Sequence, residues 1–166
     1  MDITLRPIQP EDMDFLYRLY HSTRELELDT VAWSQEQKAA FTLMQFNAQH
    51  QYYQENYTSA DFLVILAGGE PAGRLYIARW PEEIRIVDIA LLPEYRNHGI
   101  GTRLLKELLA EGERAGKPVS IHVESFNPAR RLYERLGFAV AADKGVYLLM
   151  QWSPPSAGAA NPDSTP

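Results

Sequence analysis

The part of the sequence that leaves the fold least freedom lies between residues 83 and 124, where a strand, a glycine-containing turn, a helix and a second strand follow one another. The stretch EIRIVDIALL (83–92) is apolar and rich in β-branched residues, which is typical of a buried strand. A helix is predicted from about Gly101 to Ala115, where Gly116-Lys117-Pro118 ends it, and VSIHVE (119–124) is the second strand. Strands joined through a helix run parallel in one sheet, so this unit predicts an α/β protein with at least one parallel pair.

The other segments predict a mixed α/β sheet of about six to seven strands flanked by helices, in the order β-α-α-β-β-β-α-β-α-β-β. Gly68-Gly69-Glu70-Pro71 separates two apolar runs and predicts a hairpin turn. Ser34 with Gln37 three residues later forms a capping-box pattern, which predicts the start of a helix. The remaining predicted elements are a strand at 3–8, a helix at 11–28, a short helix from about 127 to 137 and a last strand at 146–152.

Chain length and composition predict one folded domain followed by a tail. A chain of 166 residues is long enough to bury a substantial core in a single domain. Residues 1–152 contain all the periodic segments, whereas residues 153–166 (SPPSAGAANPDSTP) are rich in Pro, Ser, Ala and Gly and show no periodicity. We therefore expect a domain at 1–152 and a disordered tail at 153–166.

Charge and cysteine content argue against several classes of function. The formal net charge of −6 opposes general affinity for nucleic acid and for anionic membranes. No stretch reaches the ~18–20 apolar residues of a membrane span, and the acidic N-terminus lacks the order of a signal peptide, so a cytoplasmic protein is expected. The chain has no cysteine and therefore no thiolate nucleophile. The four histidines are too far apart for a helical metal pair, and no metal is expected.

Two glycines, Gly99 and Gly101, stand between the strand that ends near Leu92 and the following helix. Backbone N–H groups at a helix N-terminus lack intrahelical partners and, with the helix dipole, favour an anion such as phosphate. Glycine there lets a ligand reach the amides, and Arg96 could add a guanidinium to the same anion. A P-loop would need Lys-Ser/Thr after the glycines, and a dinucleotide fingerprint would need a small residue in place of Leu104, so neither fits. The alternative is that the two glycines only shape a tight strand-to-helix turn.

Two stretches carry a resemblance to a known family. LLPEYRNHGIGTRLL (91–105) resembles the acyl-CoA signature R/Q-x-x-G-x-G/A of the GCN5-related N-acetyltransferase superfamily. NPARRLYERLGF (127–138) is similar to a later motif of that family, N-x-x-A-x-x-L-Y-x-x-x-G-F, and the two motifs stand in the family's order, separated by a helix and a strand. The order of elements also matches the superfamily from Ile3 to Trp152. The resemblance implies the acyl-CoA N-acyltransferase fold, with acetyl-CoA as co-substrate.

Carried over by position, the resemblance implies a set of cofactor contacts. The backbone of Ile89, Ala90 and Leu91 would pair with the pantetheine amides. Asn127 would contact the pantetheine arm through its side chain, and Tyr133 would stand near the sulfur. Asn127 and Tyr133 are six positions apart where the family usually has seven, so the contact of Asn127 is less secure than that of Tyr133. The pyrophosphate loop would comprise Arg96, Asn97, His98, Gly99, Ile100, Gly101 and Thr102.

Acetyl transfer from a thioester to an amine needs a proton acceptor, donors for the oxyanion and a proton for the departing thiolate. The resemblance places Tyr133 near the sulfur, where its phenol would act as general acid. Several relatives place a Glu six residues before the position of Leu91, but here that position is Arg85, which cannot accept a proton. We expect Glu124 to be the base, followed by Asp88, each acting directly or through water. Because no cysteine is available as an acyl carrier, direct transfer in a ternary complex is the simpler mechanism.

The resulting hypothesis is an acetyl-CoA-dependent N-acetyltransferase that acts on a primary amine of a small molecule or peptide. Arg85 at the usual Glu position favours an alternative, a non-catalytic acyl-CoA-binding or regulatory domain. A third interpretation is a protein that binds another nucleotide or phosphate ligand at the same helix terminus. The expected partners are acetyl-CoA and the amine, with no nucleic acid and no membrane. Many relatives pair as dimers, so a homodimer stays open.

Overall fold

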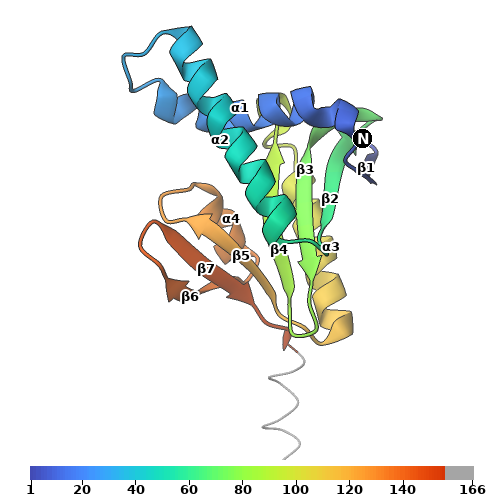
Figure 1. Ribbon diagram of the computed structural model, residues 1–166. Helices are drawn as coiled ribbons and strands as arrows, with labels where there is room; N and C mark the ends of the chain where they lie inside the picture. Colours follow the sequence, from blue (N-terminus) through green and yellow to red (C-terminus); the bar gives the residue numbers. More distant parts are fainter. Residues whose placement is uncertain (156–166) are drawn as a thin grey trace, which may run out of the picture. The chain divides into compact units, whose positions relative to one another are not determined.

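The computed structural model describes residues 1–155 and confirms the predicted order of elements (Figure 1). Within this part, four α-helices flank a mixed seven-stranded sheet with the strand order β1-β2-β3-β4-β5-β7-β6. The strands are β1 (Ile3–Pro7), β2 (Asp61–Ala67), β3 (Glu70–Arg79), β4 (Ile84–Leu91), β5 (Val119–Glu124), β6 (Ala139–Asp143) and β7 (Tyr147–Trp152). The helices are α1 (Met13–Leu28), α2 (Gln35–Asn56), α3 (Ile100–Ala115) and α4 (Ala129–Arg135), with short 3-10 turns at η1 (Pro10–Asp12) and η2 (Pro93–Tyr95).

Two compact units make up the described chain. Unit 1 comprises residues 1–76 and 89–98, and unit 2 comprises residues 77–88 and those from 99 onward. Unit 1 therefore holds β1, β2, α1 and α2, whereas unit 2 holds α3, β5, α4, β6 and β7. Strands β3 and β4 each contribute to both. Most of the tail predicted at 153–166 lies outside the described residues. Among the residues that the structure describes, no helix is long and apolar enough to cross a membrane.

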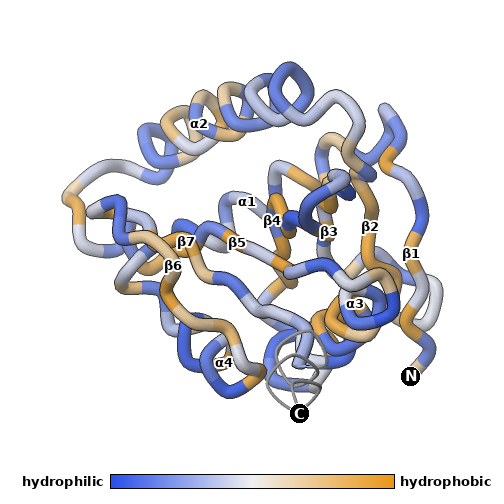
Figure 2. Tube along the Cα trace, turned by 90° about the horizontal axis from the view of Figure 1, so that it is seen from below, coloured by the Kyte–Doolittle hydropathy of each residue, from blue (hydrophilic) through white to orange (hydrophobic). Residues whose placement is uncertain are grey.

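In unit 1, helix α2 packs against α1 through a few buried residues and begins at a side-chain cap. Of its 22 residues only Thr42 and Phe46 are buried, and the helix alternates between hydrophilic and hydrophobic along its length (Figure 2). The predicted capping box is present: Ser34 Oγ accepts from the Gln37 N–H at 3.1 Å, and Gln37 Oε1 accepts from the Ser34 N–H at 2.9 Å. Phe46 joins a core cluster with residues of α1 and β2 and with the residue that follows β4: Phe15, Leu16, Leu19, Tyr20, Val64 and Leu92.

The predicted hairpin between β2 and β3 is also confirmed. Gly68 and Gly69 form its two-residue loop, and both have positive φ angles, of 57° and 86°. Glycine adopts this backbone conformation without the Cβ strain that other residues meet, which is why the pair marks a tight hairpin.

Unit 2 contains the parallel pair that the sequence predicts. Ile84 of β4 lies opposite Val119 of β5, and Ile86 lies opposite Ile121. Helix α3 approaches β5 closely, because a Cβ added at Gly112 would lie 3.0 Å from Val119 Cγ2. The buried face of α3, which includes Leu104, Leu105, Leu108 and Leu109, therefore belongs to the apolar core of this unit.

Helix α4 is shorter than predicted at both ends. The side-chain Oδ1 of Asn127 accepts a hydrogen bond from the Ala129 N–H at 2.9 Å, and Pro128 is the N-cap, so regular helix begins only at Ala129. Gly137 follows with a φ of 101°, which lies in the left-handed region that ends helices.

Candidate functional site

The N-terminus of α3 offers backbone donors that no side chain caps. Gly99 is the N-cap residue in the left-handed conformation, and its carbonyl accepts from the Arg103 N–H at 3.0 Å. The first N–H groups of the helix, from Ile100 to Thr102, precede the first intrahelical bond. The side chain of Ile100 is buried, so only its backbone is available to a ligand. A 16-residue helix adds a partial positive charge at this end, which favours an anion.

Different physical reasons account for glycine at positions 99 and 101. The φ of 81° at Gly99 requires glycine for the conformation itself, as a tight strand-to-helix turn would. Gly101 has no positive φ, and a Cβ built there would meet nothing within 4 Å. At Gly73, by contrast, a Cβ would collide with the backbone oxygen of Ala90. Because neither its own conformation nor packing within the described chain requires glycine at 101, turn shape alone explains Gly99 but not Gly101.

Arg96 is held by hydrogen bonds to the end of β4 and to helix α1. Its Nε donates to the Leu91 carbonyl oxygen at 2.9 Å, and its Nη2 donates to Ser22 Oγ at 3.3 Å. The loop that follows is exposed at Asn97 and His98, and Asn97 has a φ of 63°. Arg96 therefore fixes the start of the loop, and it keeps further N–H donors on the same guanidinium.

Pairing between β4 and β5 stops before either strand ends. The register runs from Ile84↔Val119 to Ile86↔Ile121, although β5 continues to Glu124 and β4 continues to Leu91. The backbone of β4 beyond Ile86 is therefore outside the ladder with β5. This stretch includes Ile89, Ala90 and Leu91, which are half-buried.

The candidate bases lie on opposite faces of the β4–β5 pair. Side chains alternate along a strand, so Asp88 shares a face with Ile86 and thus with Ile121, on the side that α3 approaches. Arg85 points to the other side, where its Nε donates to Ser120 Oγ at 2.7 Å. Glu124 shares that second face with Ser120. The structure therefore does not bring Asp88 and Glu124 together.

Tyr133 is buried on α4, with 6% of its surface exposed, and its ring lies 5.9 Å from that of Phe138. Burial raises the pKa of the Tyr133 phenol to about 12, and the negative charge of Asp88 adds to the shift. Both causes disfavour the phenolate. The phenol is therefore protonated at neutral pH and holds its proton more tightly than a free phenol.

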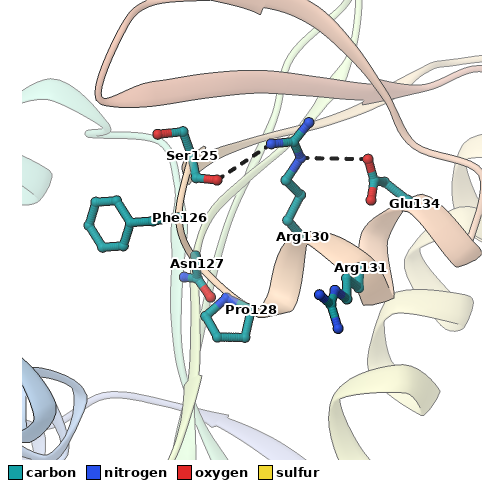
Figure 3. Close-up of a pocket in the computed structure, with 7 residues that line it drawn as sticks. All are labelled: Ser125, Phe126, Asn127, Pro128, Arg130, Arg131 and Glu134. Atoms are coloured by element: carbon teal, nitrogen blue, oxygen red, sulfur yellow. Dashed lines mark hydrogen bonds and ion pairs between the residues drawn. The ribbon is translucent and has the colours of Figure 1, made fainter.

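Asn127 lines a pocket that is formed by residues just before α4 and by residues of α4 itself (Figure 3). Its side-chain Oδ1 accepts from the Ala129 N–H, which leaves the side-chain NH₂ as a donor. Arg130 spans the pocket, donating to the Ser125 carbonyl oxygen at 3.4 Å and pairing with Glu134 at 3.5 Å. The lining residues are Ser125, Phe126, Asn127, Pro128, Arg130, Arg131 and Glu134.

Sequence reasoning missed a network around His122. Arg85 Nη1 lies 3.3 Å from His122 Nδ1, and Lys144 Nζ lies 3.2 Å from His122 Nε2. Burial lowers the pKa of His122, and the charges of Arg85 and Lys144 lower it further against the opposing charge of Glu83. Strand alternation places Ser120 and His122 on one face of the second strand, but only the β4–β5 register of the structure places Arg85 beside them. Nothing in the sequence signals the contribution of Lys144, which comes from the β6–β7 turn.

Comparison with known proteins identifies the family. The model of the acetyltransferase (GNAT) family matches residues 16–138, and the chain belongs to this family. The fold is similar to that of PaiA N-acetyltransferase from Thermoplasma acidophilum in complex with coenzyme A, with 19% identity, a TM-score of 0.69, and coverage of 92% of this chain and 99% of that one.

Two further solved structures share the fold. An acetyltransferase from Thermus thermophilus has 18% identity and a TM-score of 0.66 over 92% of this chain and 97% of its own. The ribosomal-protein-S18-alanine N-acetyltransferase from Escherichia coli has 21% identity and a TM-score of 0.60 over 92% of this chain and 94% of its own. A search of curated proteins gave no match.

Proposed function

We propose that the chain is an acetyl-CoA-dependent N-acetyltransferase that transfers the acetyl group directly to a primary amine of a small molecule or peptide. The observation that carries the proposal is the uncapped N-terminus of α3 beside the open space at Gly101. The pyrophosphate of coenzyme A would accept hydrogen bonds from the N–H groups of Ile100, Gly101 and Thr102. PaiA N-acetyltransferase, whose fold is similar, was solved in complex with coenzyme A.

The end of β4 supports the same proposal for the pantetheine arm. Beyond Ile86 the backbone of β4 is not paired with β5, so a ligand that carries amides can add to it as a further strand would. Ile89, Ala90 and Leu91 would supply these backbone groups, and the NH₂ of Asn127 would supply a side-chain donor.

In the proposed reaction, the neutral amine nitrogen attacks the thioester carbonyl carbon and forms a C–N bond. The carbonyl oxygen becomes an oxyanion that a strand N–H near Leu91 can stabilise. Collapse of this intermediate breaks the C–S bond, the amine proton passes to Glu124 directly or through water, and the departing thiolate accepts a hydrogen bond from the Tyr133 phenol. Because the chain has no cysteine to carry the acyl group, direct transfer with both substrates bound together is the simpler mechanism.

The raised pKa of Tyr133 limits what its phenol can do for the departing thiolate. A phenol with a pKa of about 12 is a weaker acid than a thiol of ordinary pKa, near ~8.5. Tyr133 would therefore stabilise the thiolate through an O–H···S hydrogen bond as the C–S bond breaks, and the thiolate would take its proton from water as coenzyme A leaves.

A valine at position 101 tests the cofactor site. Valine has better helix propensity than glycine, and a Cβ at position 101 has open space around it, so Gly101→Val should leave the unfolding midpoint unchanged or raise it. Its side chain would occupy the space of the diphosphate, and we expect acetyl-CoA to bind at least about tenfold more weakly by calorimetry. Ala110→Val, at an exposed position of the same helix, is the matched control and should bind normally. Equal affinity in Gly101→Val and the wild type would contradict the proposed site.

One observation favours a second candidate, a non-catalytic acyl-CoA-binding domain. Arg85 occupies the position where several relatives carry a Glu that accepts the proton. Its side chain donates a hydrogen bond to Ser120 and forms an ion pair with Glu83. Saturable acetyl-CoA binding without transfer to any amine in a broad panel would favour this second function over the first.

A further inference from the structure

The proposed chemistry leaves unused a network on the Arg85 face of β4 and β5, and all its members belong to unit 2. Arg85 is its fixed part: only 11% of its side chain is exposed, its Nε donates to Ser120 Oγ at 2.7 Å, and its guanidinium lies 5.1 Å from the centre of the Trp80 ring. Glu83 accepts from Ser120 and lies 3.7 Å from Arg85 Nη2, which balances the guanidinium charge.

The imidazole of His122 stands between two groups that only donate. A guanidinium and an ammonium have no acceptor, whereas an imidazole keeps at least one N–H. Because Arg85 is fixed, His122 Nδ1 accepts from it at 3.3 Å, and the ring hydrogen is assigned to Nε2. That N–H then faces Lys144 Nζ at 3.2 Å. The two donors therefore face each other with no acceptor between them.

An anionic oxygen placed between His122 Nε2 and Lys144 Nζ would accept a hydrogen bond from both. The lowered pKa of His122 is consistent with this arrangement, since a neutral ring with Nε2–H is a donor without adding a second charge beside Lys144. Lys144 is exposed and lies in the turn between β6 and β7, so its side chain can move aside by the width of an oxygen atom. Asp143, its neighbour, directs Oδ1 to the Gly145 N–H at 2.9 Å.

Glu124 lies two residues along the same strand and on the same face as His122. Alternate Cα atoms of a strand are about 7 Å apart, so a carboxylate at Glu124 and an anion site at His122 can be reached by one small molecule. On the basis of the proposed function, we infer that His122 and Lys144 form a carboxylate subsite, and that the acceptor is a small amine carrying a carboxylate, as an amino acid does. Glu124 holds the ammonium end, and the subsite holds the other.

A matched pair of acceptors tests the subsite: glycine carries both groups, and methylamine lacks the carboxylate. In the full chain, Lys144→Met should raise the KM for glycine by at least about tenfold and leave kcat nearly unchanged, because it removes one charge-assisted hydrogen bond. For methylamine, KM and kcat should change less than about twofold. Lys106→Met, at an exposed position of α3, is the control and should match the wild type for both acceptors.

A second readout does not depend on acetyl transfer. In the ¹⁵N-labelled chain, the Nε2 resonance of His122 should shift and saturate as sodium acetate is added, and this shift should be lost in Lys144→Met. If acetate shifts the resonance but no amine is acetylated, the proposed function fails and the carboxylate subsite stands. If methylamine is acetylated as well as glycine and acetate causes no saturable shift, the subsite is overturned and the acetyltransferase stands.

Discussion

The two faces of the β4–β5 pair provide opposite electrostatic environments, although neighbouring residues of each strand point to opposite faces. On one face, burial and the negative charge of Asp88 raise the pKa of Tyr133, so the phenol holds its proton. On the other face, burial together with Arg85 and Lys144 lowers the pKa of His122, so the imidazole sheds its proton. Strand alternation keeps the two environments apart. The comparison teaches that a single pair of strands can supply a protonated donor for a leaving sulfur on one side and a binding surface for an acceptor on the other.

The largest expected effect is on the Tyr133 face. Tyr133→Phe keeps the ring against Phe138 but removes the hydroxyl that donates to the thiolate, so we expect kcat to fall by about 10²–10³ while acetyl-CoA affinity stays within about twofold. Because the phenol stays protonated up to its pKa of about 12, the wild-type rate should show no loss from Tyr133 deprotonation between about pH 7 and 10. Steady-state kinetics combined with calorimetry checks both, and unchanged turnover in the variant would remove Tyr133 from the mechanism.

Substitutions at two adjacent residues of β5 compare how much each face contributes to the free energy of unfolding. Ile121 is 4% exposed on the apolar face, so Ile121→Ala should lower the free energy of unfolding by about 2–5 kcal/mol. His122 is half-buried on the polar face, and His122→Ala should cost less than about 1 kcal/mol. Urea denaturation of both variants measures the difference. Equal costs would mean that the polar face is as tightly packed as the apolar one.

The two candidate bases test which face receives the amine. If the amine approaches on the His122 face, Glu124→Gln should reduce kcat/KM by about 10²-fold, whereas Asp88→Asn should change it less than about tenfold. The reverse order would assign proton acceptance to the face of Tyr133. Acetyl-CoA affinity of both variants serves as the control for folding and cofactor binding.

The smallest expected effect is the pH dependence caused by His122. Its pKa is lower in the folded chain than in the unfolded one, so the unfolded chain binds the proton more readily. The corresponding stability is present above the unfolded pKa, near ~6.5, and is lost as the pH falls through the folded pKa. On going from about pH 7 to about pH 5, the wild type should therefore lose more stability than His122→Gln. An NMR titration should also show the His122 pKa rising in Lys144→Met, and no rise would contradict the ring–ammonium contact.

The sequence predicted the elements well because their signals are local. The capping box at Ser34, the paired glycines at 68 and 69, and the alternation in VSIHVE each reflect short-range backbone geometry, and all three are confirmed. The open space at Gly101 could be expected from a glycine before a helix, although only the structure shows that no protein atom fills it.

The rest of the site depends on contacts between distant segments. Lys144 reaches His122 from a turn 22 residues away, and no local pattern marks that contact. The separation of Asp88 from Glu124 needed the β4–β5 register, which periodicity alone does not give. The pKa of Tyr133 likewise depends on burial and on Asp88, which lies on a different element.

Calorimetric titration of the wild-type chain with acetyl-CoA tests the central claim most directly. A diphosphate bound by the free N–H groups of α3 predicts saturable heat with one site per chain, which Gly101→Val weakens without loss of fold. A chain that shows native circular dichroism but releases no heat with acetyl-CoA would contradict the account.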